Sequence, residues 1–491
     1  MLVVGGGPAG VTAALRAREC GAERVALVER DPRLGGTCTN DGCVPTRVWA
    51  KAARFLRDAA DAANYGVATA GGPPTLDFAG LQRRTRETVH ALHDRKRLAE
   101  RLSEAGVDVL TGRGSARFAD PNTVVLGGGE DGGANARLRA ERFVLCAGGS
   151  ARRPPFPGAE LTLGPTDLWS LASLPRRVVV VGAAATGCQI ASVLNAFGSV
   201  VTLLEVAPRV LPQEDAAVSE AMADALARHG VRVEVGVEGG VSSVTRAAPG
   251  EPLVVRWGEA ASESEAEADV VVCATGWPGN VAALGLDEAG ISATENGEYV
   301  AVDDTLRSVS AAHVWAAGDL TGRMMLVQCA YDDARIAGEN AARGGRCLAD
   351  DPASRLVPHG GFTDPEYGSV GLTEEQAGAD ALVATVPFAD LDRAVVDGHP
   401  AGFCKLVADR ESGRLLGAHV VGEQALEVVQ AAAAGMAAGA RIDDLADLEF
   451  AYPTITAILG MAARQACRLA GRSAGGAAAE RQPEWEAKRR G

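Results

Sequence analysis

The chain has 491 residues and a net charge of −15, from 63 Asp and Glu against 48 Lys and Arg. Nucleic acid and anionic membranes repel such an acidic chain, so we expect neither as a partner. Ten cysteines are too few for a disulfide scaffold and the N-terminus lacks a signal-peptide pattern, so we expect a cytoplasmic protein of roughly three domains.

The first predicted elements are a strand, a glycine-rich turn and a helix. Residues 2–4 predict a buried strand and residues 11–20 a helix, and a second strand at 25–28 ends at Glu29. The glycines between strand and helix let the backbone approach a pyrophosphate, the helix N-terminus offers free N–H groups, and the acid accepts hydrogen bonds from ribose hydroxyls. This order predicts a dinucleotide-binding unit that uses Gly5, Gly7, Gly10 and Glu29.

A cysteine pair follows this unit, within Gly35–Arg47. Cys38 and Cys43 are five residues apart around Gly42, and Pro45 stands where a helix is expected to begin. Such a pair can close a small disulfide loop, and the helix N-terminus lowers the pKa of a thiol. The pattern indicates a redox site. The alternatives are a zinc site, which lacks further ligands at suitable spacing, and two unrelated buried thiols.

The first pattern recurs in the middle of the chain. A strand at 178–181, a turn at 182–187, a helix to about residue 197 and a strand at 200–204 lead to Glu205. Val178–Leu204 contains no charged residue and is long enough to span a membrane, but four consecutive valines and the glycines after them favour a strand, turn and helix. We therefore predict a second dinucleotide site at Gly182, Gly187 and Glu205.

Three other segments carry simpler predictions. The acidic run 263–269 predicts a solvated turn, and residues 471–491, rich in Gly, Ala and charge, predict a disordered tail. No histidine is a clear catalytic base, and we expect His93, in a polar helical stretch, to be solvated.

Taken together, these motifs resemble the pyridine nucleotide-disulfide oxidoreductases, the flavoprotein family of dihydrolipoamide dehydrogenase, glutathione reductase and mercuric reductase. The resemblance runs from Leu2 to about Ala470 and includes Cys146–Ser150, Ala274–Gly276, Ala317–Asp319 and Phe362–Glu366. It implies FAD at the first fingerprint and NAD(H) at the second, with Asp319 on the ribityl chain of the flavin. Further cofactor contacts are expected at Gly36, Thr37, Gly149 and Gly276.

The resemblance also implies the fold class and the domains. We expect an α/β protein with two Rossmann-like domains and a C-terminal α+β dimerisation domain. The FAD-binding domain would span 1–157 and 296–350, the NAD-binding domain 158–295 and the interface domain of a homodimer 351–470. Cys43 would be the thiol nearest the flavin, and Cys38 would exchange with a small-molecule substrate. No metal site is predicted.

The C-terminal motif departs from the family pattern. Dihydrolipoamide dehydrogenases and glutathione reductases place a His-Pro-Thr with a following glutamate against the partner's exchanging thiol, whereas this chain has Tyr452 and Ala457. A phenol with a pKa near 10 is a poor proton shuttle, so we do not expect efficient reduction of lipoamide or glutathione disulfide. Tyrosine here is similar to mercuric reductases and soluble transhydrogenases, although mercuric reductases carry tail cysteines and transhydrogenases lack the redox pair. Tyr452 can also be an interface packing residue.

A second departure concerns the charge beside the flavin. Arg47 and Gln189 stand where dihydrolipoamide dehydrogenases pair a lysine with a glutamate. If the family geometry holds, Arg47 is a cation without a partner and stabilises the anionic flavin and the Cys43 thiolate. The alternative is that Arg47 turns to another carboxylate and Gln189 only packs.

These observations predict an FAD-dependent enzyme that moves electrons between NADH, FAD, the cysteine pair and a thiol or disulfide substrate. Glu205 would repel a 2′-phosphate and favour NADH over NADPH, although Arg209 can soften this preference. Alternatives are a mercuric-ion, metal or electrophile reductase, a flavin-dependent dithiol oxidase, and a dihydrolipoamide dehydrogenase-like subunit that serves as an assembly component.

Overall fold

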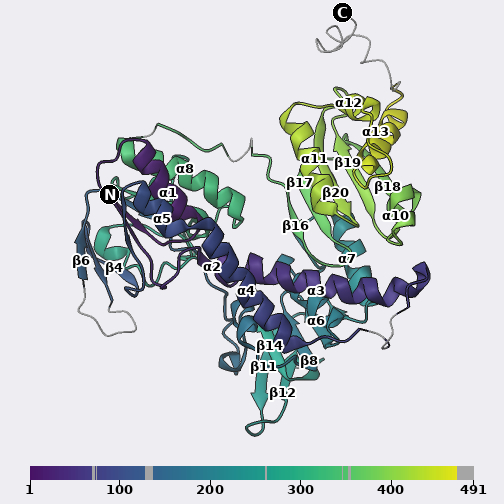
Figure 1. The fold of residues 1–491 in the computed structure, drawn as a ribbon, viewed down its shortest axis with the longest axis horizontal. Helices are drawn as coiled ribbons and strands as arrows, with labels where there is room; N and C mark the ends of the chain where they lie inside the picture. Colours follow the sequence, from purple (N-terminus) through teal and green to yellow (C-terminus); the bar gives the residue numbers. More distant parts are fainter. Residues whose placement is uncertain are drawn as a thin grey trace, which may run out of the picture.

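The computed structural model describes residues 1–68, 72, 74–127, 136–259, 262–345, 347–351 and 355–472. The predicted tail, apart from its first two residues, lies outside these ranges. Figure 1 shows the chain arranged as three bodies, each built around its own sheet, with the long helix α3 running between them.

The first body contains a parallel sheet with the strand order β15-β7-β1-β2-β3. Helices α1 (Pro8–Glu19) and α8 (Val327–Arg343) pack on one face, and the antiparallel meander β4-β5-β6 packs on the other. Both faces are buried, which explains the short apolar strands. The strands are β1 (Leu2–Val4), β2 (Val25–Val28), β3 (Val107–Leu110), β4 (Ala116–Asp120), β5 (Thr123–Leu126), β6 (Ala136–Arg139), β7 (Phe143–Leu145) and β15 (Val314–Ala316).

The second body repeats this plan with the parallel order β10-β9-β8-β14, the helices α6 (Ala185–Ala196) and α7 (Ala216–Arg228), and a second meander. The uncharged run Val178–Leu204 folds as β8, α6 and β9, and no described helix is long and apolar enough to cross a membrane. The strands are β8 (Arg177–Val181), β9 (Val200–Leu204), β10 (Arg232–Glu234), β11 (Val241–Arg246), β12 (Leu253–Trp257), β13 (Ser264–Ala268) and β14 (Val270–Cys273).

We expected a solvated turn at the acidic run 263–269, but this run contains strand β13. Glu265 and Glu267 alternate with less exposed residues, and Arg256 on the neighbouring β12 lies 3.0 Å from the carboxylate of Glu265. The negative charges are therefore tolerated because they share the solvent face of a half-buried strand.

The redox segment forms a short helix, α2 (Gly36–Asn40), followed by the 19-residue α3 (Cys43–Asp61). Helix α3 begins at Cys43, two residues before the expected start at Pro45. Trp49 and Ala53 are buried against the second body, while Arg57 lies 3.1 Å from Asp364 of the C-terminal body. The pair of helices α4 (Phe78–Lys96) and α5 (Leu98–Glu104) follows, and α4 contacts both α2 and α3.

The C-terminal body is an antiparallel sheet with the order β16-β17-β20-β19-β18. Its strands are β16 (His359–Gly361), β17 (Tyr367–Gly371), β18 (Leu382–Pro387), β19 (Phe403–Ala408) and β20 (Leu415–Val421), and its helices are α9 (Glu374–Ala377), α10 (Asp392–Val396), α11 (Ala425–Ala437), α12 (Ile442–Asp447) and α13 (Ala457–Leu469). The buried Lys405 of this sheet lies 2.8 Å from Asp215, which caps α7, so a charged contact ties this body to the second.

Candidate active site

The first glycine turn has the geometry that the fingerprint predicts. Gly5 has φ +105°, and a Cβ there would lie 2.2 Å from the carbonyl oxygen of Cys146. A Cβ at Gly10 would lie 1.8 Å from the carbonyl oxygen of Gly5. Gly7 caps α1 without a side-chain hydrogen bond, so the first N–H groups of the helix are free for a phosphate.

The second turn repeats this geometry. Gly182 has φ +99°, and a Cβ at Gly187 would lie 1.8 Å from the carbonyl oxygen of Gly182. Ala184 caps α6 with φ −74° and ψ −173°, nearly the values of −73° and −173° at Gly7. Ala184 is exposed.

The two acids also occupy equivalent positions. Glu29 accepts hydrogen bonds from the N–H groups of Gly6 (2.6 Å) and Asp31 (2.9 Å). Glu205 accepts hydrogen bonds from those of Ala183 (2.6 Å) and Ala207 (2.9 Å). Each carboxylate therefore fixes its glycine turn, and its remaining lone pairs can accept hydrogen bonds from a ribose.

The other predicted cofactor residues lie at close backbone contacts. A Cβ at Gly36 would lie 2.8 Å from the Cα of Gly7, so the redox segment starts directly above the first glycine turn, and Thr37 follows in α2. Gly149 forms an isolated antiparallel bridge with Gly279. Gly276 has φ +127°, and its carbonyl accepts a hydrogen bond from the N–H of Arg152.

Cys38 and Cys43 are in side-chain contact, as a redox pair requires. The pKa of Cys43 is lowered to about 7, mainly because the Cys38 thiol donates a hydrogen bond to its sulfur, and a backbone N–H at the start of α3 adds to this. The same hydrogen bond and burial raise the pKa of Cys38. In the reduced pair the negative charge therefore resides on Cys43, the thiol at the helix N-terminus.

Three further groups lie around this pair, and sequence reasoning missed two of them, Lys96 and Tyr331. Asp319, in the 3₁₀ turn Gly318–Thr321, raises the pKa of both thiols by its charge, whereas Lys96 at the end of α4 lowers both. The pKa of Tyr331 on α8 is raised first by burial and then by Cys38. Asp319 itself was predicted, but as a cofactor contact and not as a neighbour of the thiols. Lys96 and Tyr331 are far from the pair in sequence, and no motif contains them.

We expected His93 to be solvated, but it is half-buried and lies against the redox segment. Its Nε2–H donates a hydrogen bond of 2.7 Å to Oδ1 of Asn40, two residues after Cys38. The packing of α4 against α2, which the helical pattern alone does not reveal, explains the difference.

Arg47 has a partner, which corrects the expectation of an uncompensated cation. Its guanidinium stacks on the ring of Phe362 at 4.3 Å and lies 3.9 Å from Oε1 of Glu366. Gln189 accepts a hydrogen bond from the N–H of Phe362 at 3.2 Å, so its side chain serves packing of the C-terminal body. The alternative outcome therefore holds, because the segment 362–366 places a carboxylate beside Arg47.

Tyr452 lies on the surface of the C-terminal body and is 79% exposed in the single chain. Its hydroxyl donates a hydrogen bond of 2.8 Å to Oδ2 of Asp392, the first residue of α10, and this bond raises the pKa of the phenol. The sequence did not indicate this carboxylate, which is sixty residues away.

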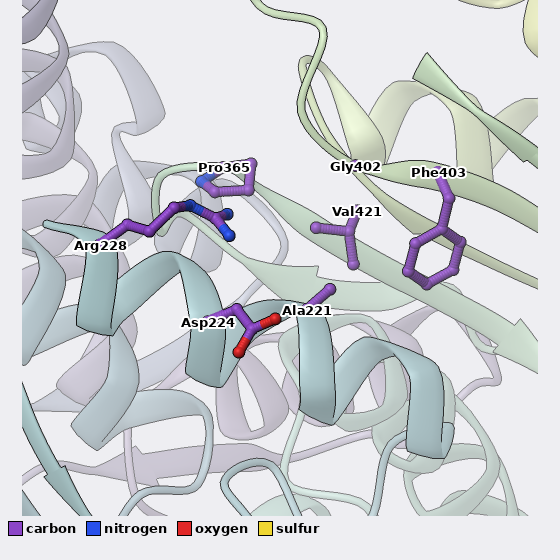
Figure 2. A pocket seen from close by; sticks show the side chains of 7 residues that line it. All are labelled: Ala221, Asp224, Arg228, Pro365, Gly402, Phe403 and Val421. Atoms are coloured by element: carbon purple, nitrogen blue, oxygen red, sulfur yellow. The ribbon is translucent and has the colours of Figure 1, made fainter. Parts of the chain in front are cut away.

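A cavity of about 230 Å³ lies elsewhere, between α7 and the C-terminal sheet. Figure 2 shows Asp224 and Arg228 of α7 on one side and Phe403 and Val421 on the other. None of its lining residues belongs to the cofactor motifs or to the cysteine pair, so it is separate from the site described above.

The residues present fit FAD. The N–H groups of the first turn of α1 have no side-chain cap, and the backbones of Gly7 and Gly36 lie in close contact beside them. Burial raises the pKa of the Asp319 carboxyl, and within the described ranges no side chain donates a hydrogen bond to it. Ribityl hydroxyls would supply those donors.

Two family models match the chain. That of the pyridine nucleotide-disulphide oxidoreductases matches residues 1–334, and that of the dimerisation domain of the same family matches residues 357–463. Family members use FAD and NAD(P)H, and the second domain makes this protein a homodimer.

Relatives and solved structures agree with these matches. A dihydrolipoyl dehydrogenase of Pseudomonas aeruginosa is 35% identical over 93% of this chain and 94% of its own, and a mercuric reductase of Lysinibacillus sphaericus is 31% identical over 94% and 82%. The HOCl-induced flavoprotein disulfide reductase RclA from Escherichia coli has a TM-score of 0.80 at 28% identity, over 94% of this chain and 99% of that one. The chain therefore belongs to the pyridine nucleotide-disulfide oxidoreductases and is an FAD-dependent enzyme of that family.

Proposed function

We propose that this enzyme is an NADH-dependent disulfide reductase in which Cys38 and Cys43 carry electrons to a small disulfide. The observation that carries the proposal is the contact between the two thiols, with the charge on Cys43 at the start of α3. Bound FAD would supply two-electron transfer between the nicotinamide and the cysteine pair.

The thiols would then act in two steps. The Cys38 thiol passes its proton to the Cys43 thiolate, and the Cys38 thiolate so formed attacks one sulfur of the substrate, whose S–S bond breaks. The leaving thiolate takes a proton from water, and Cys43 returns its proton to solvent. The Cys43 thiolate attacks the Cys38 sulfur, releases the second thiol and restores the Cys38–Cys43 disulfide. Over one cycle NADH gives a hydride, and together with one net proton from solvent this yields NAD⁺ and two thiols.

The orientation of Arg209 supports NADH as the reductant. Its guanidinium donates hydrogen bonds to the carbonyls of Pro212 (3.0 Å) and Glu214 (3.3 Å), so it is turned toward its own loop. The Glu205 carboxylate is then left to repel a 2′-phosphate.

A metal-ion reductase is the second candidate. Two of the similar proteins are linked to metals by name or title: the mercuric reductase, and RclA, which has been solved as a Cu(II) complex with a TM-score of 0.81. A pair of thiols is a suitable soft ligand for such ions.

Anaerobic reduction by NADH tests the proposal. It should expose two thiols beyond those of the oxidised enzyme and create a long-wavelength thiolate–flavin band, which Cys43→Ser abolishes and Cys38→Ser preserves. Reduced enzyme would then be mixed with a panel of disulfides, dithiols, quinones, Hg(II) and Cu(II). Rapid reoxidation by metal ions alone would replace the first candidate by the second, and the absence of new thiols would refute both.

A further inference from the structure

Two basic side chains in the last turn of α4 contact the residues that directly follow Cys38. Lys96 Nζ donates a hydrogen bond of 3.1 Å to Oγ1 of Thr39, a residue that is 1% exposed. His93 Nε2 donates one of 2.7 Å to Asn40. The ammonium group is thus anchored to the buried hydroxyl of the residue that follows Cys38.

We propose that Lys96 is a positioning residue of the redox pair: fixed on Thr39, its ammonium keeps a positive charge beside Cys38 and stabilises the thiolate that this sulfur forms during exchange. The inference rests on the proposed function, in which Cys38 is the thiol that attacks the substrate. This role of Lys96 does not involve the bound cofactor.

The charges that face Cys38 from each neighbouring element decide the sign of the effect. Cys43 on α3 and Asp319 in the 3₁₀ turn before α8 both disfavour a second negative charge, whereas Lys96 on α4 favours it. Tyr331 on α8 also lies near the pair and is held in its neutral form by burial. Among these groups of the described chain, Lys96 is the cation that opposes Asp319.

His93 stabilises this geometry without adding charge. Its pKa is lowered first by burial and then by the nearby cations Arg33, His90 and Lys96, whereas Asp94 has a smaller opposing effect. It is therefore neutral near pH 7, and its Nε2–H stays bonded to Asn40 in either protonation state. The contact holds the end of α4, and with it Lys96, against α2.

Lys96 also explains how the site can work without the acid–base pair that Tyr452 and Ala457 replace. An ammonium is a poor proton donor at neutral pH, but it can stabilise the attacking thiolate by charge alone. The chain then supplies the charge within one subunit, and water supplies the proton.

The test measures the protonation of Cys38 directly. Holoenzyme carrying Cys43→Ser, reduced with dithiothreitol, leaves Cys38 as the one thiol of the pair. Its alkylation by iodoacetamide is followed across a pH series by peptide mass spectrometry. Lys96→Met is compared with Lys96→Arg, which keeps the charge, and with Arg95→Met, which removes an exposed cation from the same turn.

Lys96→Met should raise the titration midpoint by about one pH unit and slow alkylation at neutral pH about tenfold, because a neighbouring opposite charge shifts a pKa by roughly 1–3 units. Lys96→Arg should restore most of the rate, and Arg95→Met should change little. Adding Thr39→Val to Lys96→Met should not shift the titration midpoint further, since the Thr39 hydroxyl then has no ammonium group to position.

Unchanged titration in Lys96→Met with full FAD content, or an equal shift in Arg95→Met, would overturn the proposal. If Lys96→Met loses FAD, Lys96→Gln and Lys96→Arg give the same comparison. Because dithiothreitol replaces NADH and iodoacetamide replaces the substrate, this result is independent of whether NADH reduces the pair in the unmutated enzyme, which is the test of the proposed function.

Discussion

Glu366 should destabilise the folded enzyme at neutral pH, although it faces a cation. Burial is the main cause that raises its pKa from 4.5 to about 6, and Arg47 opposes this only in part. At 3.9 Å the attraction to Arg47 lies between about 1 kcal/mol in water and about 4 kcal/mol at an effective dielectric constant of ~20. The arginine side chain is 50% exposed, so the lower end applies and desolvation prevails.

The sign of the pH dependence follows from the raised pKa. Between pH 4.5 and about 6 the folded chain binds more protons at Glu366 than the unfolded chain does, so the free energy of unfolding falls as the pH rises through this window. A shift of about 1.5 units corresponds to about 2 kcal/mol above the window. Glu366→Gln should recover this, with a Tm increase of roughly 2 °C for a chain of this size.

The assay is thermal unfolding of the FAD-loaded dimer at pH 7.5 and pH 5, with the exposed Glu220→Gln in α7 as the matched control. The gain should shrink to less than half at pH 5, where the wild-type carboxyl is largely protonated. A lower Tm for Glu366→Gln at pH 7.5, or a difference independent of pH, would show that the ion pair with Arg47 is net stabilising and would refute the reasoning.

Three further outcomes are expected. Gly10→Ala should yield protein without flavin absorbance, because the new methyl group would lie 1.8 Å from the carbonyl oxygen of Gly5; a yellow variant would contradict this. Glu205→Ser should raise the ratio of kcat/KM with NADPH to kcat/KM with NADH about tenfold. A wild-type enzyme that already uses NADPH as well as NADH would refute the role of Glu205 in NADH preference. Tyr452→His should speed disulfide reduction at pH 7 at least about tenfold, because an imidazole bonded to Asp392 forms an acid–base pair; an unchanged rate would assign position 452 to packing.

The sequence predicts best what short spacings determine. Each fingerprint needs one glycine with a positive φ and a second glycine packed against the carbonyl oxygen of the first. Both glycines lie within a stretch of six residues, at Gly5–Gly10 and at Gly182–Gly187. The strands beside them are short and fully buried, so their apolar runs are distinctive. The parallel sheets and both glutamate positions follow from the same local pattern.

Contacts between distant segments could not be predicted in the same way. The pairing of Tyr452 with Asp392 and that of Arg47 with Glu366 depend on how the C-terminal sheet packs, which no local periodicity records. Strand β13 was missed because its glutamates suggested solvent, although their alternation is that of a half-exposed strand. Lys96 reaches the redox segment only through the packing of α4 on α2.

The place of β15 in the first sheet has a consequence for folding during synthesis. β7 pairs with β15 in parallel register, but about 170 residues separate them, which a ribosome needs roughly 10 to 30 s to add. During that time β7 presents an open apolar edge, and α1 lacks its packing partner α8. The strands of the second body are complete at Cys273, so we expect the second body to fold before the first body, which begins earlier in the chain.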